Sequence, residues 1–137
     1  MASRLNPYLN FPGTAREAMT FYQEVLGGDL VLNTFEGFTP EPTPFDKNIM
    51  HAQLDTSSGY TLMGSDGPPG GEVKPGNNFS VSISGDDAEE LRGYFTRLSE
   101  GGTVNVPLEK QAWGDEFGSF TDRFGIEWMV NITQPQA

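Results

Sequence analysis

The chain repeats one pattern of secondary structure twice, and this internal repeat constrains its fold more than any other feature. Residues 14–26 and 87–98 each read as an amphipathic helix that follows an alternating strand and precedes further strands. Superposing Ala15 on Ala88 also aligns Glu17 with Glu90, Phe21-Tyr22 with Tyr94-Phe95, Val25 with Leu98 and Gly28 with Gly101. The repeat predicts two duplicated modules of strand, helix and three strands. The alternative is that two unrelated amphipathic helices share these features.

Signals at both ends of the helices set their predicted bounds. Thr14 and Glu17 form a capping-box pattern, and Asp87 and Glu90 repeat it. The apolar stripe of the first helix consists of Ala15, Ala18, Met19, Tyr22, Val25 and Leu26, and that of the second of Ala88, Leu91, Phe95 and Leu98. Glycine pairs at 27–28 and 101–102 are typical of helix ends.

Strands are predicted at 5–11, 29–35, 50–55, 60–64 and 78–84. In three of them, 5–11, 50–55 and 78–84, apolar and polar residues alternate with a period of two. The apolar sets of three of them are Leu5, Leu9 and Phe11; Met50, Ala52 and Leu54; and Phe79, Val81 and Ile83. The polar sets are Asn6, Tyr8 and Asn10; His51, Gln53 and Asp55; and Asn78, Ser80 and Ser82.

Residues 107–132 combine charged and aromatic groups with turn signals. Residues 122–125 predict a tight turn between two strands, because Gly125 can supply a positive φ. In the strand that follows, Ile126, Trp128, Val130 and Ile132 alternate with Glu127, Met129 and Asn131. Its mixed face either meets solvent or lines a cavity, and the sequence leaves both possibilities open.

Length, composition and charge exclude several classes of protein. A chain of 137 residues fits one compact domain. It contains no apolar run long enough for a membrane span and no signal-peptide segment, so cytoplasmic residence is expected. The absence of cysteine means that any metal would need nitrogen and oxygen ligands. A formal net charge of -11 argues against nucleic acid as a partner.

Two segments rich in glycine and proline divide the chain. Residues 36–48 read as an irregular surface loop and residues 65–77 as a linker. We therefore expect a single domain over 1–137, with one module at about 4–65, a linker at about 66–77 and a second module at about 78–133.

Several motifs together resemble a known family. They are NPYL, AREAMTFYQEVLGG, LMGSD, NNFSVSISGDDAEEL and PLEKQAWGDEFGSFTDRFGIEWMVNI. These are similar to the PhnB-like branch of the vicinal oxygen chelate superfamily, which includes glyoxalase I, bleomycin-resistance proteins and extradiol dioxygenases. The resemblance implies an α+β fold of two tandem βαβββ modules, with curled mixed sheets around a cavity and helices outside. It also implies a homodimer, and the polar strand faces would then look into the cavity.

The resemblance also bears on metal binding. Metal-dependent members use His and Glu side chains from the first and last strands of each module. Those positions correspond here to Asn6 or Pro7, Asn78 or Phe79, Leu62 or Met63, and Met129. None is a His or a carboxylate, so we expect no metal and no other cofactor. The alternative is a divalent Zn, Ni, Mn or Fe ion held by other groups, such as His51 with Asp55 and a carboxylate of residues 109–116.

Candidate site residues follow from the polar faces and the hairpin. His51, the chain's single histidine, is the candidate catalytic base, although a hydrogen-bonded cavity or interface role is the alternative. Trp113 could line a pocket or contact a second subunit. Lys110 is a possible partner for an anion. The expected ligand-binding residues are Asn6, Tyr8, His51, Gln53, Asn78, Ser80, Gln111, Trp113, Asp115, Phe117 and Met129.

Three functions remain open from the sequence. The leading one is a metal-independent, small-molecule-binding protein. The first alternative is a metal-dependent lyase, isomerase or dioxygenase, or an enzyme that transfers a proton through His51. The second is an antibiotic-sequestering binder of the bleomycin-resistance type, whose acidity would attract a cation. A methyltransferase is not expected, because no glycine-rich Rossmann fingerprint is present.

Overall fold

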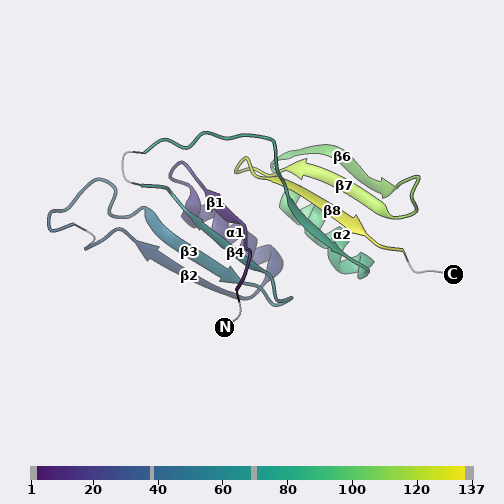
Figure 1. Cartoon of the computed structure of the whole chain (residues 1–137), viewed down its shortest axis with the longest axis horizontal. Coiled ribbons are helices and arrows are strands. Elements are labelled where there is room, and N and C mark those ends of the chain that lie inside the picture. Colours follow the sequence, from purple (N-terminus) through teal and green to yellow (C-terminus); the bar gives the residue numbers. More distant parts are fainter. Residues whose placement is uncertain (1–2, 38, 69–70, 135–137) are drawn as a thin grey trace. The chain divides into compact units, whose positions relative to one another are not determined.

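The fold consists of two compact units that divide between Lys74 and Pro75. The computed structural model describes residues 3–37, 39–68 and 71–134. The first unit contains β1 (Tyr8–Asn10), α1 (Ala15–Leu26), β2 (Asp29–Thr34), β3 (Ile49–Asp55) and β4 (Thr61–Ser65). The second contains β5 (Val81–Gly85), α2 (Ala88–Ser99), β6 (Thr103–Lys110), β7 (Glu116–Thr121) and β8 (Glu127–Ile132) (Figure 1).

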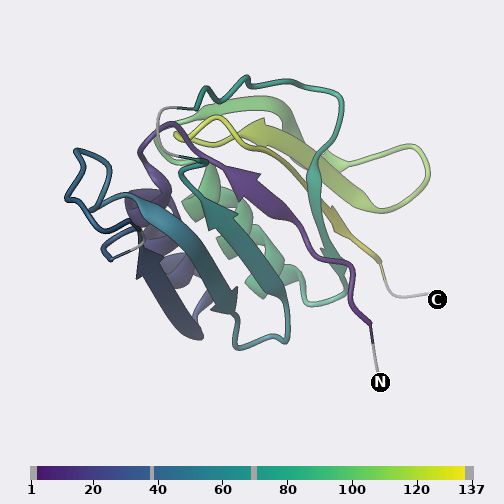
Figure 2. The ribbon, with the colours of Figure 1, turned by 60° about the vertical axis from the view of Figure 1, so that its left-hand side comes forward.

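Each unit forms one four-stranded mixed sheet. The strand order is β1-β4-β3-β2 in the first sheet and β5-β8-β7-β6 in the second. The first strand of each unit runs parallel to the last, and the other pairings are antiparallel. The strands β1 to β4 are seen side by side in Figure 2. The predicted α+β fold of two βαβββ modules is confirmed.

One face of each sheet is buried under the helix of its own unit. The helix α1 packs on β2, β3 and β4, and α2 packs on all four strands of the second sheet. In the second unit the rings of Phe95 and Phe120 meet edge to face at 5.1 Å, and Phe120 stacks on Trp128 at 6.3 Å. Burial of such apolar side chains is the main favourable term in folding. The opposite face of each sheet has no helix of its own unit over it.

The turn between β7 and β8 is confirmed, and it contains an additional buried group. Gly125 has a φ of 88°. The Asp122 carboxylate accepts hydrogen bonds from the backbone N–H groups of Phe124 and Ile126 at 2.8 and 3.0 Å. It also accepts the indole N–H of Trp128 at 2.8 Å. Asp122 therefore joins the turn to the core.

The predicted helix bounds are confirmed, but the predicted Thr14 cap is wrong. The Thr14 side chain makes no capping hydrogen bond. Instead, Asp66 Oδ1, just beyond β4, accepts the N–H of Ala15 at 2.8 Å. At α2 the predicted cap is confirmed, because Asp87 Oδ1 accepts the N–H of Glu90 at 3.1 Å. A carboxylate brought in by tertiary structure thus replaces a local hydroxyl at α1.

Three strand predictions need correction. The segment 5–11 is a strand only over Tyr8–Asn10, where β4 provides hydrogen-bond partners, and Leu5 is fully exposed. The segment 78–84 begins as a strand only at Val81, and Phe79 is exposed. Met50 is also exposed, because the pairing of β2 with β3 shifts register beside it and buries Ile49 instead.

The predicted irregular segments are confirmed as far as the structure describes them, except that Ser65 is the last residue of β4. Residues 36–37, 39–48, 66–68 and 71–77 contain no helix or strand. Residues 38, 69 and 70, which belong to the same predicted segments, lie outside the described residues.

Candidate functional site

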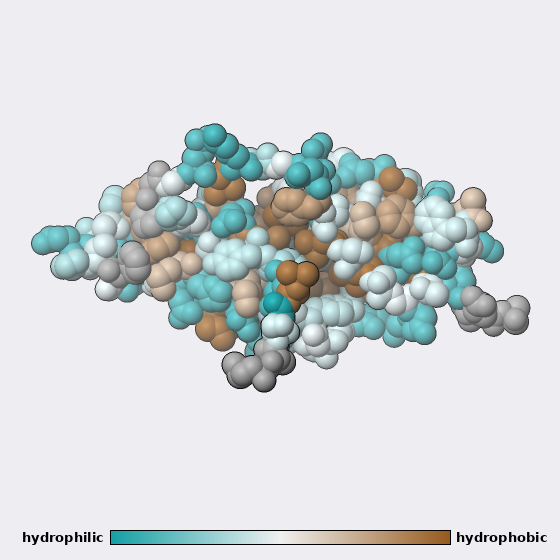
Figure 3. Space-filling view, viewed as in Figure 1, coloured by the Kyte–Doolittle hydropathy of each residue, from teal (hydrophilic) through white to brown (hydrophobic). Residues whose placement is uncertain are grey.

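The open face of the first sheet carries three of the predicted ligand-binding residues, Tyr8, His51 and Gln53. At its centre, Met63 of β4 lies between Tyr8 of β1 and Gln53 of β3 in the strand register. The cross-strand neighbour of Gln53 on β2 is Val31, which is 57% exposed. The surface seen in Figure 3 mixes hydrophilic and hydrophobic residues. Aromatic, thioether and amide groups therefore meet on a face that no helix of the unit covers.

Tyr8 and His51 form a direct pair on this face. The Tyr8 hydroxyl lies 3.3 Å from His51 Nδ1, within hydrogen-bond distance, and the two ring centroids are 5.7 Å apart. The pair fixes one ring nitrogen of the imidazole and leaves Nε2 for another partner. The side chain of His51 is half-buried, and its strand neighbour on β2 is Asn33. The predicted candidate base is thus held in place by a predicted binding residue.

A polar network continues from Gln53 toward the end of the sheet. Gln53 Nε2 donates to Asp55 Oδ2 at 3.0 Å, and the Thr61 hydroxyl donates to Asp55 Oδ1 at 2.9 Å. These two hydrogen bonds lower the pKa of Asp55, the bond from Gln53 having the larger effect, and Arg4 adds to it. Arg4 Nη1 donates to Thr61 Oγ1 at 3.4 Å. The carboxylate is therefore stabilised in its charged form.

A cavity of about 490 Å³ opens beside this network. Arg4 and Asn6 line one part of it, and Asp55, Tyr60 and Thr61 line another. Asn6 was predicted as a binding residue, whereas Arg4, Tyr60 and Thr61 were not. Arg4 precedes the first predicted strand, and no local pattern distinguishes it from other surface arginines.

The open face of the second sheet has a similar centre. Met129 of β8 lies between Ser82 of β5 and Ser119 of β7 in the strand register. Asn131 and Phe117 are the next cross-strand pair on the same face. Met129, Asn131 and Phe117 are half-buried. Two predicted residues, Met129 and Phe117, are therefore brought to one face, and the amide of Asn131 joins them.

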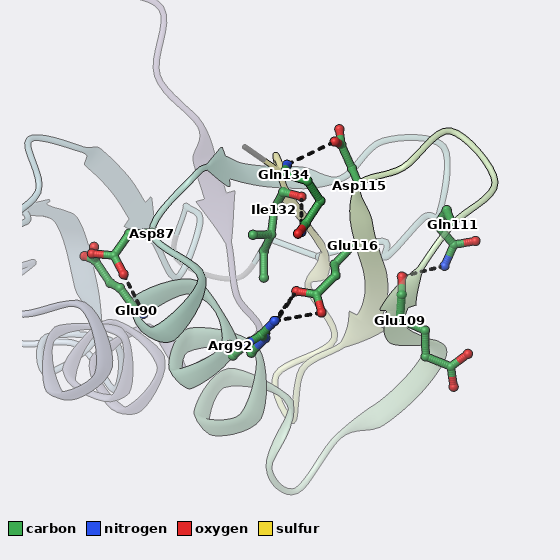
Figure 4. Close-up of polar contacts among 9 residues, drawn as sticks. All are labelled: Asp87, Glu90, Arg92, Glu109, Gln111, Asp115, Glu116, Ile132 and Gln134. Atoms are coloured by element: carbon green, nitrogen blue, oxygen red, sulfur yellow. Dashed lines mark hydrogen bonds and ion pairs between the residues drawn. The ribbon is translucent and has the colours of Figure 1, made fainter. Parts of the chain in front are cut away.

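The turn between β6 and β7 carries the remaining aromatic group. Trp113 is 63% exposed, and its ring centroid is 6.0 Å from that of Phe117. Gln111 Nε2 donates to the carbonyl oxygen of Glu109 at 2.9 Å, which holds the base of the turn (Figure 4). Trp113 is therefore presented at the surface by an ordered hairpin.

Two carboxylates of this hairpin are already engaged. Asp115 accepts hydrogen bonds from Asn131 Nδ2 at 3.0 Å and from the backbone N–H of Gln134 at 3.3 Å. Arg92 reaches from α2 to Glu116, and its guanidinium binds both carboxylate oxygens at 2.8 Å (Figure 4). These bonds raise the pKa of Arg92. Both carboxylates therefore hold the hairpin to neighbouring elements.

Asn78 and Ser80 occupy a different position from the other predicted residues. Both are exposed and precede β5, so they are not part of the strand. The structure does not group them with Met129 on the sheet itself.

The residues at the expected metal positions do not suit a divalent ion. The expected first-strand positions, Asn6 or Pro7 and Asn78 or Phe79, precede β1 and β5. On the open faces of the strands themselves, the first and last strands hold Tyr8 and Met63 in one unit and Ser82 and Met129 in the other. A phenol, a hydroxyl and two thioethers are poor ligands for Zn, Ni, Mn or Fe(II) compared with imidazole and carboxylate. Within residues 3–37, 39–68 and 71–134, no three His, Asp or Glu side chains gather in a metal-binding group.

Known proteins resemble this chain over nearly its whole length. Residues 4–130 match the family model described as Glyoxalase/Bleomycin resistance protein/Dioxygenase superfamily. Protein YjdN of Escherichia coli (strain K12) is 29% identical over 144 residues, which cover 96% of this chain and 97% of YjdN. The crystal structure of protein PA1353 from Pseudomonas aeruginosa is 41% identical, with a TM-score of 0.86, and the match covers 98% of this chain and 100% of that one.

A third comparison concerns the fold alone. A Bacillus cereus structure described as a putative 3-demethylubiquinone-9 3-methyltransferase, PhnB protein, has 23% identity and a TM-score of 0.74. The match covers 96% of this chain and 100% of that one.

No helix of the described residues has the length and apolar character that crossing a membrane requires.

Proposed function

We propose that this chain, which belongs to the glyoxalase/bleomycin resistance protein/dioxygenase superfamily, binds a small organic molecule without the help of a metal ion. One observation carries the proposal: the helix-free face of each sheet has a methionine at its centre, flanked by aromatic, amide and hydroxyl groups. A sheet face that only meets water usually carries mostly charged and polar side chains. Apolar and aromatic surface with a few polar groups is typical of ligand sites.

In the first unit, the proposed contacts come from Tyr8, Met63 and Gln53. The Tyr8 ring is 46% exposed, so an aromatic or planar ligand can pack against it. Methionine adapts its shape to such a ligand and makes favourable sulfur–aromatic contacts. The amide of Gln53 can donate or accept a hydrogen bond and thereby orient the ligand.

In the second unit, Phe117, Met129 and Asn131 supply the same kinds of group. Asp115 accepts a hydrogen bond from Asn131 Nδ2. This bond holds the amide of Asn131 in place, and its carbonyl oxygen can accept a hydrogen bond from a ligand. Trp113 lies beside Phe117 and extends the aromatic surface. These residues support the same proposal independently of the first unit.

Metal-free binding is tested by elemental analysis and thermal shift. We expect untagged protein to contain no stoichiometric Zn, Ni, Mn, Co or Fe, and its melting temperature to stay unchanged when these ions are added. An ion that binds only the folded state would raise the apparent stability. One bound metal per chain would contradict the proposal and favour a metal-dependent enzyme.

The binding site itself is tested by screening and substitution. A library of small aromatic and polar compounds is screened for a rise in melting temperature, and each hit is titrated calorimetrically. We expect Tyr8→Ala or Phe117→Ala to weaken binding of a hit by about tenfold or more, because each removes an aromatic contact. The control Val104→Ala removes an exposed side chain that pairs with Phe120 on the helix-covered face. An equal loss of affinity in all three variants would argue against ligand binding at the open sheet faces.

The contact between Tyr8 and His51 favours proton transfer as a second candidate function. An imidazole whose Nδ1 is held in a hydrogen bond presents Nε2 as a proton acceptor or donor. If a bound compound is turned over, His51→Gln should abolish turnover while changing affinity less than Tyr8→Ala does. Turnover that survives in His51→Gln would exclude this role.

Other expectations from the sequence belong to the same proposal. We expect a homodimer, which light scattering can test, and cytoplasmic residence, which fractionation can test. We also expect one folding domain with a linker at about 66–77, so that thermal unfolding should show a single transition.

A further inference from the structure

The cavity beside Arg4 differs in character from the open face next to it. Its volume is about 490 Å³, which lies within the range of roughly 300–1,000 Å³ found for small-molecule pockets. The turn between β3 and β4 contributes Tyr60 and Thr61, and the chain before β1 contributes Arg4 and Asn6. Opposite charges line the same small space, because Asp55 is also part of the wall.

A single hydroxyl separates the two charged groups. Arg4 donates to Thr61 Oγ1 at 3.4 Å, and the Thr61 hydroxyl donates to Asp55 at 2.9 Å. Neither the ion pair of Lys47 with Glu36 nor that of Arg92 with Glu116 involves Arg4 or Asp55, and the hydrogen bonds that link these two groups run through Thr61. The charges are therefore close together without neutralising each other in a salt bridge.

Both groups keep hydrogen-bonding capacity for a ligand. A guanidinium has five N–H donors, and Arg4 uses one of them on Thr61. Each oxygen of Asp55 accepts one hydrogen bond and retains lone pairs for another donor. The same two bonds lower the pKa of Asp55, so the carboxylate stays ionised at neutral pH.

The wall of the cavity also offers uncharged contacts. Tyr60 is 36% exposed, so its ring is available to an apolar group. Asn6 is half-buried and carries an amide that can donate and accept. A ligand that enters this space meets a cation, an anion, an aromatic ring and an amide.

We infer that this cavity binds a small zwitterion of the α-amino acid class, with its carboxylate on Arg4 and its ammonium group on Asp55. The inference rests on the proposed function, because it names the ligand class for the first unit. A simple anion would bind Arg4 but would be repelled by Asp55, and a simple cation would meet the reverse difficulty. A zwitterion satisfies both groups, and each charge-assisted hydrogen bond adds affinity.

The side chain of such a ligand can extend from the cavity over the open face of the first sheet. Thr61 and Asp55 lie two residues along their strands from Met63 and Gln53, and Asn6 lies two residues before Tyr8 in the sequence. Two residues of a strand span about 7 Å, which is the scale of an amino acid side chain. An apolar or aromatic side chain would thus lie over Met63 and toward Tyr8, so aromatic amino acids should bind best.

The test uses defined probes on the full chain. The twenty L-amino acids are screened by thermal shift and by NMR chemical-shift changes, beside the compound library described above. L-Phenylalanine is then compared with 2-phenylethylamine, which lacks the carboxylate, and with 3-phenylpropanoate, which lacks the ammonium group. We expect the affinity for L-phenylalanine to be at least about tenfold higher than the affinity for either analogue, because each analogue loses one charge-assisted contact.

Matched substitutions locate the contacts. Arg4→Gln should remove the preference for L-phenylalanine over 2-phenylethylamine, and Asp55→Asn should remove its preference over 3-phenylpropanoate. The controls Arg16→Gln and Glu17→Gln change exposed charges on α1 and should keep both preferences. All four positions are exposed, so we expect each variant to retain the fold. Circular dichroism of each variant checks this.

The outcomes separate this inference from the proposed function. Library compounds that bind while no amino acid does would overturn the inference and leave the proposed function standing. An amino acid that binds Arg4→Gln and Asp55→Asn as tightly as it binds the unchanged protein would also overturn it. If neither the library nor any amino acid binds, both fail.

Discussion

The carboxylate of Asp66 accepts the backbone N–H of Ala15 at 2.8 Å, although 51 residues separate the two in the sequence. Its second oxygen accepts the N–H of Ile49 at 2.7 Å. Asp66 therefore joins the end of β4 to the start of α1 and to the start of β3. Its side chain is buried, and the three elements it connects enclose the core of the first unit.

Removing this carboxylate should destabilise the first unit. We expect Asp66→Ala to lower the free energy of unfolding by about 2 kcal/mol or more, because two buried N–H donors lose their partner. Urea denaturation monitored by circular dichroism measures the change. The control Thr14→Ala should change stability by less than about 0.5 kcal/mol, since Thr14 makes no capping bond. A larger effect at Thr14 than at Asp66 would contradict the assignment of the cap.

Gly118 of β7 should not tolerate a side chain. A Cβ atom there would lie 2.7 Å from Phe95 Cε2 and 2.8 Å from Leu108 Cα. The second contact involves backbone, which cannot yield by a rotamer change. We expect Gly118→Ala to cost about 1–3 kcal/mol of unfolding free energy, measured by thermal or urea denaturation. An unchanged melting temperature would mean that β6 lies farther from β7 at this point.

Gly93 of α2 should behave in the opposite way. Apart from its chain neighbours and the adjacent backbone of its own helix, no heavy atom of the protein lies within 4 Å of a Cβ built at this position. Alanine favours the helix by about 1 kcal/mol over glycine in a helix interior. We therefore expect Gly93→Ala to raise the free energy of unfolding by about 0.5–1 kcal/mol and to raise the melting temperature. A destabilised variant would show that something else occupies this surface of α2.

Asp55 should titrate below its ordinary pKa of 3.8. Hydrogen bonds from Gln53 and Thr61 favour its charged form. The stability that this ionised group contributes is therefore present above its ordinary pKa and is lost as the pH falls through the lower, folded-state pKa. In carboxyl-detected NMR titrations we expect Gln53→Met to raise the pKa of Asp55 more than Thr61→Val does. The control Val104→Ala, which alters neither of these hydrogen bonds, should leave it unchanged.

The two tryptophans should differ in their access to a quencher. The exposed fraction is 63% for Trp113 and 1% for Trp128. We expect acrylamide to quench the fluorescence of Trp128→Phe strongly and that of Trp113→Phe weakly. Measurements over a range of protein concentrations add a second result. Quenching of Trp113 that falls as concentration rises would favour contact with a second copy over a free, ligand-facing ring.

The elements that the sequence predicted well depend on local interactions. The bounds of α1 and α2 follow from apolar periodicity and from glycines after the last turn. The turn at 122–125 follows from Gly125, which adopts the positive φ that its position requires. Alternation predicts Tyr8 on the polar face of its strand and His51 and Gln53 on the polar face of theirs, and the structure groups Tyr8 with His51.

The parts that were missed depend on contacts between distant residues. The hydrogen bond from Arg4 to Thr61 spans 57 positions, and no local pattern selects either residue. Leu5 and Phe79 continue an alternating pattern, but their segments extend past the strands that could pair with them. Met50 alternates correctly with Ala52, yet a register shift buries Ile49 in its place. Periodicity thus predicts which residues can share a face, whereas strand pairing decides which ones do.

The parallel pairing of first and last strands has a consequence for synthesis on the ribosome. β1 pairs with β4, so Tyr8 reaches its place beside Met63 only after most of the first half has been made. β5 waits in the same way for β8, where Val81 pairs with Trp128. Closing such long segments costs chain entropy before the strand contacts form. Neither half can therefore complete its sheet before its final strand has left the exit tunnel.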